Sequence, residues 1–157
     1  MRIRSLVVVS VALVCALAFA STASAQDPTG VWKVNLAKSK YSPGPAPKSS
    51  TNTTTAADGG FKSVTDTVPA TGAAVHTENS WKFDGKDNPV KGNPNADTLA
   101  YTKVDARHYT VVAKKGGKVT VTSKIEVSAD GKSRTSTQSG TDAQGKPVSN
   151  VIWSDKQ

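Results

Sequence analysis

Short segments with strand character recur about every 10 to 15 residues along this chain, and no segment after residue 25 has the helical period. The clearest lies at 31–36, where Trp32, Val34 and Leu36 share one face. Nine such segments are expected, at residues 31–36, 49–56, 61–68, 75–83, 98–104, 107–114, 118–128, 132–139 and 148–154. Tight turns join many of them, which predicts an all-β fold with sequential antiparallel hairpins. We expect a single up-and-down barrel, because a meander this long leaves open edges unless it closes.

The first 25 residues have the pattern of a secretory signal peptide. Arg2 and Arg4 provide a short positive region, an apolar run covers residues 6–20, and Ala23-Ser24-Ala25 is a small-x-small cleavage pattern. The run is shorter than the about 20 residues that a membrane-spanning helix needs. We therefore expect cleavage after Ala25, a mature barrel domain at 26–157 with no transmembrane segment, and a periplasmic or secreted protein.

Composition of the expected mature chain supports strands but gives only a small apolar core. Leu, Ile, Val and Phe account for 20 of its 132 residues, a low share that is also found in disordered chains. Against disorder, it carries 17 threonines and all three tryptophans, which favour strands. Loss of Arg2 and Arg4 lowers the net charge from +8 to +6, and the lysines are dispersed. In an exported protein this charge favours a soluble surface or an anionic partner over nucleic acid.

Two segments between the expected strands have distinct compositions. Residues 42–48 contain prolines at 43, 45 and 47, which predicts an extended connector within the barrel domain. Residues 84–97 are rich in Asp, Asn, Gly and Pro, which predicts a loop. Oxygen ligands gather there, as calcium requires, but their spacing does not match a calcium-binding loop. Turn formation is the preferred interpretation, and no metal site is expected.

The mature chain resembles a family of small exported bacterial proteins of uncharacterised function. The motifs that carry the resemblance are Gly-Val-Trp-Lys at 30–33, Lys-Ser-Lys-Tyr at 38–41, Pro-Gly-Pro-Ala-Pro-Lys at 43–48, Asp-Gly-Lys-Asp at 84–87, Pro-Val at 89–90, Pro-Asn-Ala-Asp-Thr at 94–98 and Gly-Thr-Asp-Ala-Gln-Gly-Lys-Pro at 140–147. This resemblance implies a family but no activity. Gly30-Val31-Trp32 is also similar to the G-x-W signature of the lipocalins, which implies that Trp32 closes one end of a barrel. A structural plug is the preferred role for Trp32, and a place in a cavity wall is the alternative.

Arg134, Ser136 and Gln138 share one face of the expected strand at 132–139, and the opposite face is equally polar. One polar face must therefore meet the barrel interior, unless this is an edge strand with water on both sides. If Arg134 points inward, its charge needs a partner, and an anionic ligand would supply one. The strand at 75–83 places Thr77, Asn79 and Trp81 on one face, a mixture of polar and aromatic groups typical of ligand pockets. Trp81, Arg134, Thr77 and Asn79 are the candidate ligand-binding residues.

No catalytic motif is recognisable in the sequence. His76 and His108 are the only histidines, and neither lies in a pattern that suggests a catalytic triad. The only cysteine, Cys15, lies within the leader. We expect no enzymatic activity and no cofactor, and we expect a lipocalin-like barrel that binds a small amphipathic or anionic molecule. The alternative is an envelope or protein-interaction module with a filled core.

Overall fold

The alternating segments form ten antiparallel strands in the computed structural model, which describes residues 27–157. The predicted leader at 1–25 and its cleavage after Ala25 lie outside the described residues. The strands are β1 (Gly30–Val34), β2 (Ser49–Ala57), β3 (Gly60–Val68), β4 (Val75–Trp81), β5 (Asp87–Lys91), β6 (Thr98–Lys103), β7 (His108–Lys115), β8 (Lys118–Val127), β9 (Ser133–Thr141) and β10 (Pro147–Lys156). Each pairs with the next along the chain, and β1 pairs with β10, so the sheet is a closed barrel. The predicted all-β up-and-down barrel is confirmed.

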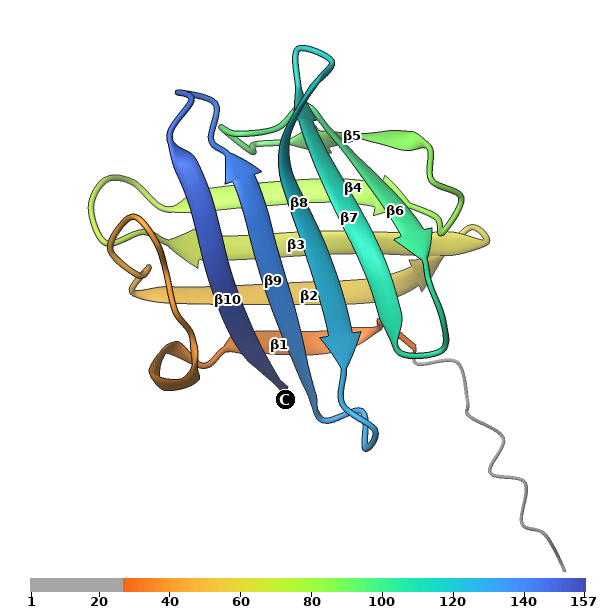
Figure 1. Cartoon of the computed structure of the whole chain (residues 1–157). Helices are drawn as coiled ribbons and strands as arrows, with labels where there is room; N and C mark the ends of the chain where they lie inside the picture. The colour runs from red at the N-terminus through yellow and green to blue at the C-terminus, as the bar shows by residue number, and fades with distance from the viewer. Residues whose placement is uncertain (1–26) are drawn as a thin grey trace, which may run out of the picture.

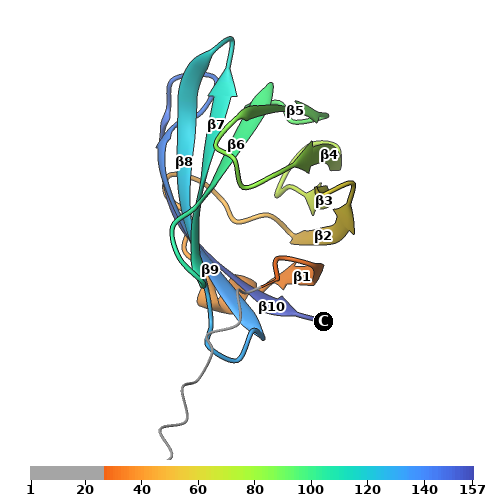
Figure 2. The same ribbon diagram turned by 90° about the vertical axis from the view of Figure 1, so that its right-hand side faces the viewer.

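The barrel is flattened into two curved layers whose strands cross at a steep angle. Strands β6 to β10 run across the front in Figure 1, over β1 to β5 behind them. Figure 2 shows the two layers facing each other, with β10 crossing toward β1 at the base. Side chains at alternate positions of every strand therefore point into the space between the layers. Among residues 27–157, no helix has the length and hydropathy that crossing a membrane requires.

Strand β5 corrects the prediction of a loop over residues 84–97. Asp87–Pro89 pair with β6, whereas Val90 and Lys91 pair with β4. Each half of β5 pairs with its neighbour at only two or three positions, and Pro89 has no N–H to donate. The segment is also rich in turn-forming residues, so its composition gives little sign of a strand. Closure of the barrel decides its conformation, because β4 and β6 both need a neighbour there.

The first strand is shorter than predicted. It ends at Val34, and Leu36 begins a short 3-10 helix, η1 (Leu36–Lys38). Asn35 caps this helix by accepting a hydrogen bond from the Lys38 N–H at 3.2 Å. Leu36 is therefore exposed. The prediction that Leu36 shares one face with Trp32 and Val34 was wrong.

Gly140 allows strands β8 and β9 to approach closely. Its φ is +143°, and a Cβ at this position would collide with the carbonyl oxygen of Thr120. We expect Gly140→Ala to lower the free energy of unfolding by about 1–3 kcal/mol through strain of this kind. Gly44→Ala is the matched control, because Gly44 has the same φ but no neighbouring atom within 4 Å of the added carbon. Equal losses for the two variants in chemical denaturation would contradict the steric explanation.

Candidate functional site

The inward positions of the strands line a cavity of about 470 Å³ between the two layers. Ligand pockets in proteins commonly range from about 300 to 1,000 Å³. All three members of the predicted polar row on β9, Arg134, Ser136 and Gln138, line this cavity. β9 is also paired on both sides, with β8 and β10, so it is not an edge strand.

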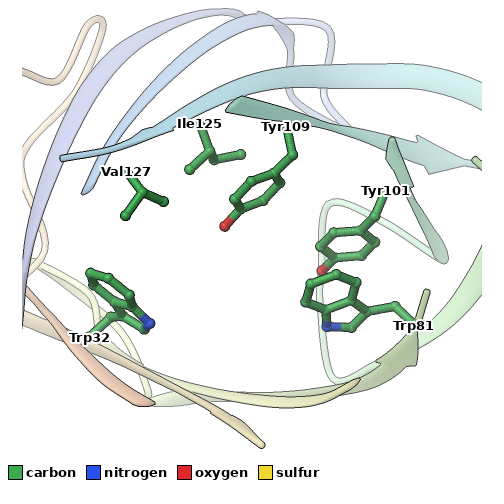
Figure 3. Close-up of a cluster of buried hydrophobic side chains, with 6 residues drawn as sticks. All are labelled: Trp32, Trp81, Tyr101, Tyr109, Ile125 and Val127. Carbon is green, nitrogen blue, oxygen red and sulfur yellow. The ribbon is translucent and has the colours of Figure 1, made fainter. Parts of the chain in front are cut away.

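A cluster of large side chains fills the barrel at one side of this cavity. Its buried members are Trp32, Trp81, Tyr101, Tyr109, Ile125 and Val127. Figure 3 shows Trp32 opposite Val127, with Trp81 and Tyr101 side by side. The Trp81 and Tyr101 rings stack with centroids 4.0 Å apart. The barrel interior therefore has a packed aromatic part and a hollow part.

Trp32 is the most deeply buried large side chain among the described residues. Only 1% of it is exposed, and its Nε1 donates a hydrogen bond to the carbonyl oxygen of Pro28 at 3.0 Å. The guanidinium carbon of Arg134 lies 4.6 Å from its ring centroid, and Nζ of Lys156 lies 5.2 Å from it. Both cations interact favourably with the ring. Trp32 thus packs in the aromatic cluster and also contacts the predicted ligand-binding arginine.

A chain of hydrogen bonds joins Trp81 to Arg134 through side chains of β2 and β3. Trp81 Nε1 donates to Ser63 Oγ at 2.8 Å, and the Ser63 and Thr54 hydroxyls are 2.9 Å apart. Thr54 Oγ1 donates to Asn52 Oδ1 at 3.1 Å, and Arg134 Nη2 donates to the same oxygen at 3.0 Å. Because the Thr54 proton points to Asn52, the Ser63 hydroxyl must donate to Thr54. These polar groups of β2 and β3 are therefore occupied in holding one another.

The other predicted residues of β4 face inward but do not line the cavity. Asn79 is buried, and its Nδ2 donates to the Tyr101 hydroxyl at 3.1 Å. Thr77 Oγ1 lies 3.5 Å from the carbonyl oxygen of Thr65, to which it donates. Trp81 does line the cavity, but only 4% of it is exposed, since Tyr101 and Phe61 lie close to its ring. The structure thus brings Trp81 and Arg134 to one cavity and leaves Thr77 and Asn79 outside its lining.

The cavity wall carries a positive charge that no carboxylate neutralises directly. Within residues 27–157, no carboxylate lies within 4.0 Å of the Arg134 guanidinium. Asp142, the one acidic residue of the lining, accepts hydrogen bonds from the backbone N–H groups of Gln144 and Lys146 in the β9–β10 turn. Burial raises the pKa of the Tyr101 phenol, so this hydroxyl stays neutral at physiological pH. The lining therefore holds one cation, Arg134, and one carboxylate that is bonded within its own turn and not to this cation.

A second cavity of about 320 Å³ lies under the proline-rich connector. Pro45 and Pro47 line it from the connector, Tyr41 lines it from just before the connector, and Pro69 lines it from the β3–β4 loop. It shares five lining residues with the main cavity, namely Val34, Ser50, Gln138, Asn150 and Ile152. The connector is attached to β10 by a bond from the Ser149 N–H to the Ser42 carbonyl at 2.7 Å, and Lys40, two residues before it, pairs with Val151. The prolines of residues 42–48 predict the connector, but no pattern in the sequence indicates its place beside the cavity.

Neither histidine lines the main cavity. His76 is exposed on β4, where contacts with Asp66 at 2.6 Å and Glu78 at 3.1 Å raise its pKa. His108 contacts Asp105 at 2.8 Å. Over residues 27–157, no three His, Cys, Asp or Glu side chains gather in a way that could hold a metal ion.

The polar segment at 84–97 uses its side chains in turns and surface ion pairs. Asp84 Oδ1 accepts from the Lys86 N–H, and Asn93 Oδ1 accepts from the Asn95 N–H. Asp97 pairs with Lys115 at 2.7 Å and also accepts from the Gly116 N–H. These bonds account for the composition of the segment by turn chemistry.

Fold and site together define a ten-stranded up-and-down barrel whose cavity has a mixed polar and apolar lining and an arginine that is in no ion pair within the described part of the chain. Lipocalins have eight strands, so the strand number differs from that of the family to which the G-x-W motif is similar. Comparison of the chain with protein-family models, curated proteins and solved structures finds no match.

Proposed function

We propose that this protein binds a small anionic or amphipathic molecule inside its barrel. The observation that carries the proposal is the Arg134 guanidinium, which faces a cavity of about 470 Å³ with Asn52 as its one hydrogen-bond partner. A guanidinium has five N–H donors and can hold a carboxylate through two of them. An anion in the cavity would satisfy the remaining donors and neutralise the charge.

The lining also suits the apolar body of such a ligand. Strands β6 to β8 contribute Leu99, Val111, Val121 and Ile125 to the wall. Carbon groups placed against these side chains would lose contact with water, which is favourable. A filled interior would have favoured the protein-interaction module that we hold as the alternative, whereas the hollow supports a ligand.

We propose that the protein binds this molecule without converting it chemically. Four titratable side chains line the main cavity, those of Tyr101, Tyr109, Arg134 and Asp142, and they include no histidine and no pair of carboxylates. No cofactor is part of the proposal. The periplasm or the external medium is the proposed location, and this rests on the leader pattern of residues 1–25 alone.

Tryptophan fluorescence tests the proposal, in a Trp153→Phe background that leaves the two interior indoles, Trp32 and Trp81, as reporters. Dodecanoate is the anionic probe, cholate is a bulkier anion, and dodecanol is a neutral probe of the same chain length. We expect saturable binding of an anionic probe that is weakened about tenfold or more in Arg134→Met, because a charge-assisted bond is lost while the apolar stem is kept.

Arg107→Met is the matched control, since Arg107 faces Glu126 at 3.9 Å and does not line the cavity. It removes the same charge from the protein and should leave binding unchanged. The proposal fails if no probe binds more tightly than about 100 μM, or if Arg134→Met binds dodecanoate as tightly as the parent protein.

A further inference from the structure

Strand β9 places a row of polar side chains along the main cavity, those of Arg134, Ser136 and Gln138, and each has donor capacity that the protein does not use. The hydroxyls of Thr54 and Ser63 are engaged in the network that ends at Asn52. By contrast, Ser136 makes no side-chain hydrogen bond, and Arg134 makes one. The β9 row therefore offers hydrogen bonds to a ligand, whereas these two hydroxyls of the opposite wall are already used.

The orientation of Gln138 follows from a backbone group. The Ser42 N–H donates to Asn150 Oδ1 at 3.0 Å, which fixes the oxygen side of the Asn150 amide. Asn150 Nδ2 then donates to Gln138 Oε1 at 3.1 Å. Because Oε1 of Gln138 faces Asn150, its Nε2 donor is left without a protein partner. Gln138 and Asn150 both line the main cavity and the second cavity, so this donor lies where the two meet.

Gln138 lies four positions after Arg134 on an extended strand, so the Cα atoms of the two residues are about 13 Å apart. Figure 1 shows β9 beside β10, and Ser42 of the proline-rich connector is bonded to β10. A ligand that meets both donors would extend from the aromatic part of the barrel toward the space beneath Pro45 and Pro47.

We propose that the ligand is an elongated anion with a second hydrogen-bond acceptor about 13 Å from its charged group, and that Gln138 is the residue that selects for this acceptor. The inference rests on the proposed function, because Arg134 must first hold the anion. Arg134 fixes the charged end, the apolar side chains of β7 and β8 contact the middle, and Gln138 Nε2 donates to the far end beneath the connector.

A cycle of two probes and two proteins tests this inference by calorimetry. Dodecanoate has only its carboxylate, whereas 12-hydroxydodecanoate adds an oxygen at the far end of the same chain. We expect the parent protein to bind the hydroxylated probe about threefold to tenfold more tightly, the value of one net hydrogen bond. Gln138→Leu should remove this preference while it keeps the affinity for dodecanoate within about twofold.

Gln144→Leu is the control, because Gln144 is an exposed residue of the β9–β10 turn. If Gln138→Leu does not fold, Gln138→Met serves in its place, since it keeps an unbranched side chain without the amide. A preference that survives loss of the Gln138 amide, or a parent protein that binds both probes equally, overturns the inference and leaves Arg134-dependent binding intact. Absence of Arg134-dependent binding for both probes would instead overturn the proposed function, and this inference with it.

Discussion

Trp32→Ala should lower the free energy of unfolding by about 3–5 kcal/mol, as for other large aromatic side chains removed from a core. The indole is 1% exposed and lies in the buried cluster with Ile125 and Val127. Its removal would also take the aromatic surface away from beneath the Arg134 guanidinium. For a chain of this size the thermal midpoint should fall by roughly 10–20 °C.

Trp153→Ala provides the comparison within the same protein. Trp153 lies on β10 but does not line the main cavity, and its Nε1 donates to Asp155 at 2.8 Å near the surface. Its loss should cost clearly less than the loss of Trp32. Urea denaturation measures the loss in free energy of unfolding for both variants. A Trp32→Ala midpoint equal to that of the parent protein would show that the indole is not part of the core.

Asn52→Leu is expected to destabilise the barrel by about 2–4 kcal/mol, although leucine has nearly the same size. The Asn52 amide accepts hydrogen bonds from Arg134 and Thr54, and it donates to Thr65 at 2.8 Å. Leucine can replace none of these bonds. The guanidinium would lose its one hydrogen-bond partner, and the Thr54 hydroxyl, which keeps its bond with Ser63, would lose the acceptor of its proton. Each of the three lost bonds contributes about 0.5–1.5 kcal/mol, and more where the donor is charged.

A double-mutant cycle separates this network from the loss of Asn52 alone. Combined with Arg134→Met, Asn52→Leu should cost about 1 kcal/mol less than it does in the parent protein, because no guanidinium is then left without its partner. Thr53→Leu is the control on the outer face of the same strand. Strictly additive losses for Asn52→Leu and Arg134→Met would show that their hydrogen bond contributes nothing to stability.

Much of the fold could be predicted, because the alternation of polarity reports directly on which side chains share a face. The row of Arg134, Ser136 and Gln138 was expected to form one face, and it lines the cavity. The fifth strand was missed because its pairing is divided between two neighbours and includes Pro89. Its conformation depends on closure of the barrel, which is a long-range effect that local composition does not report.

The site was harder to predict than the fold. Periodicity placed Thr77 and Asn79 on the face of Trp81, but it does not report how far the hollow extends or which groups bond across strands. Asn79 bonds to Tyr101, 22 residues further along the chain, and Arg134 bonds to Asn52, 82 residues before it. Trp32 and Arg134 were treated as separate features, a plug and a ligand group, whereas the structure brings them into contact.

Pairing of β1 with β10 has a consequence for how the chain acquires its structure. The pairs Trp32–Lys156 and Val34–Ser154 join the start of the barrel to its last residues. A chain that emerges from its N-terminus cannot close the barrel until residues 154–156 of β10 are free, and contacts of such long sequence separation form slowly. Until then β1 exposes an unpaired edge, which invites association with other chains. The β10 residues Ser154 to Lys156 therefore close the barrel, and a chain that lacks them would leave two open edges in place of none.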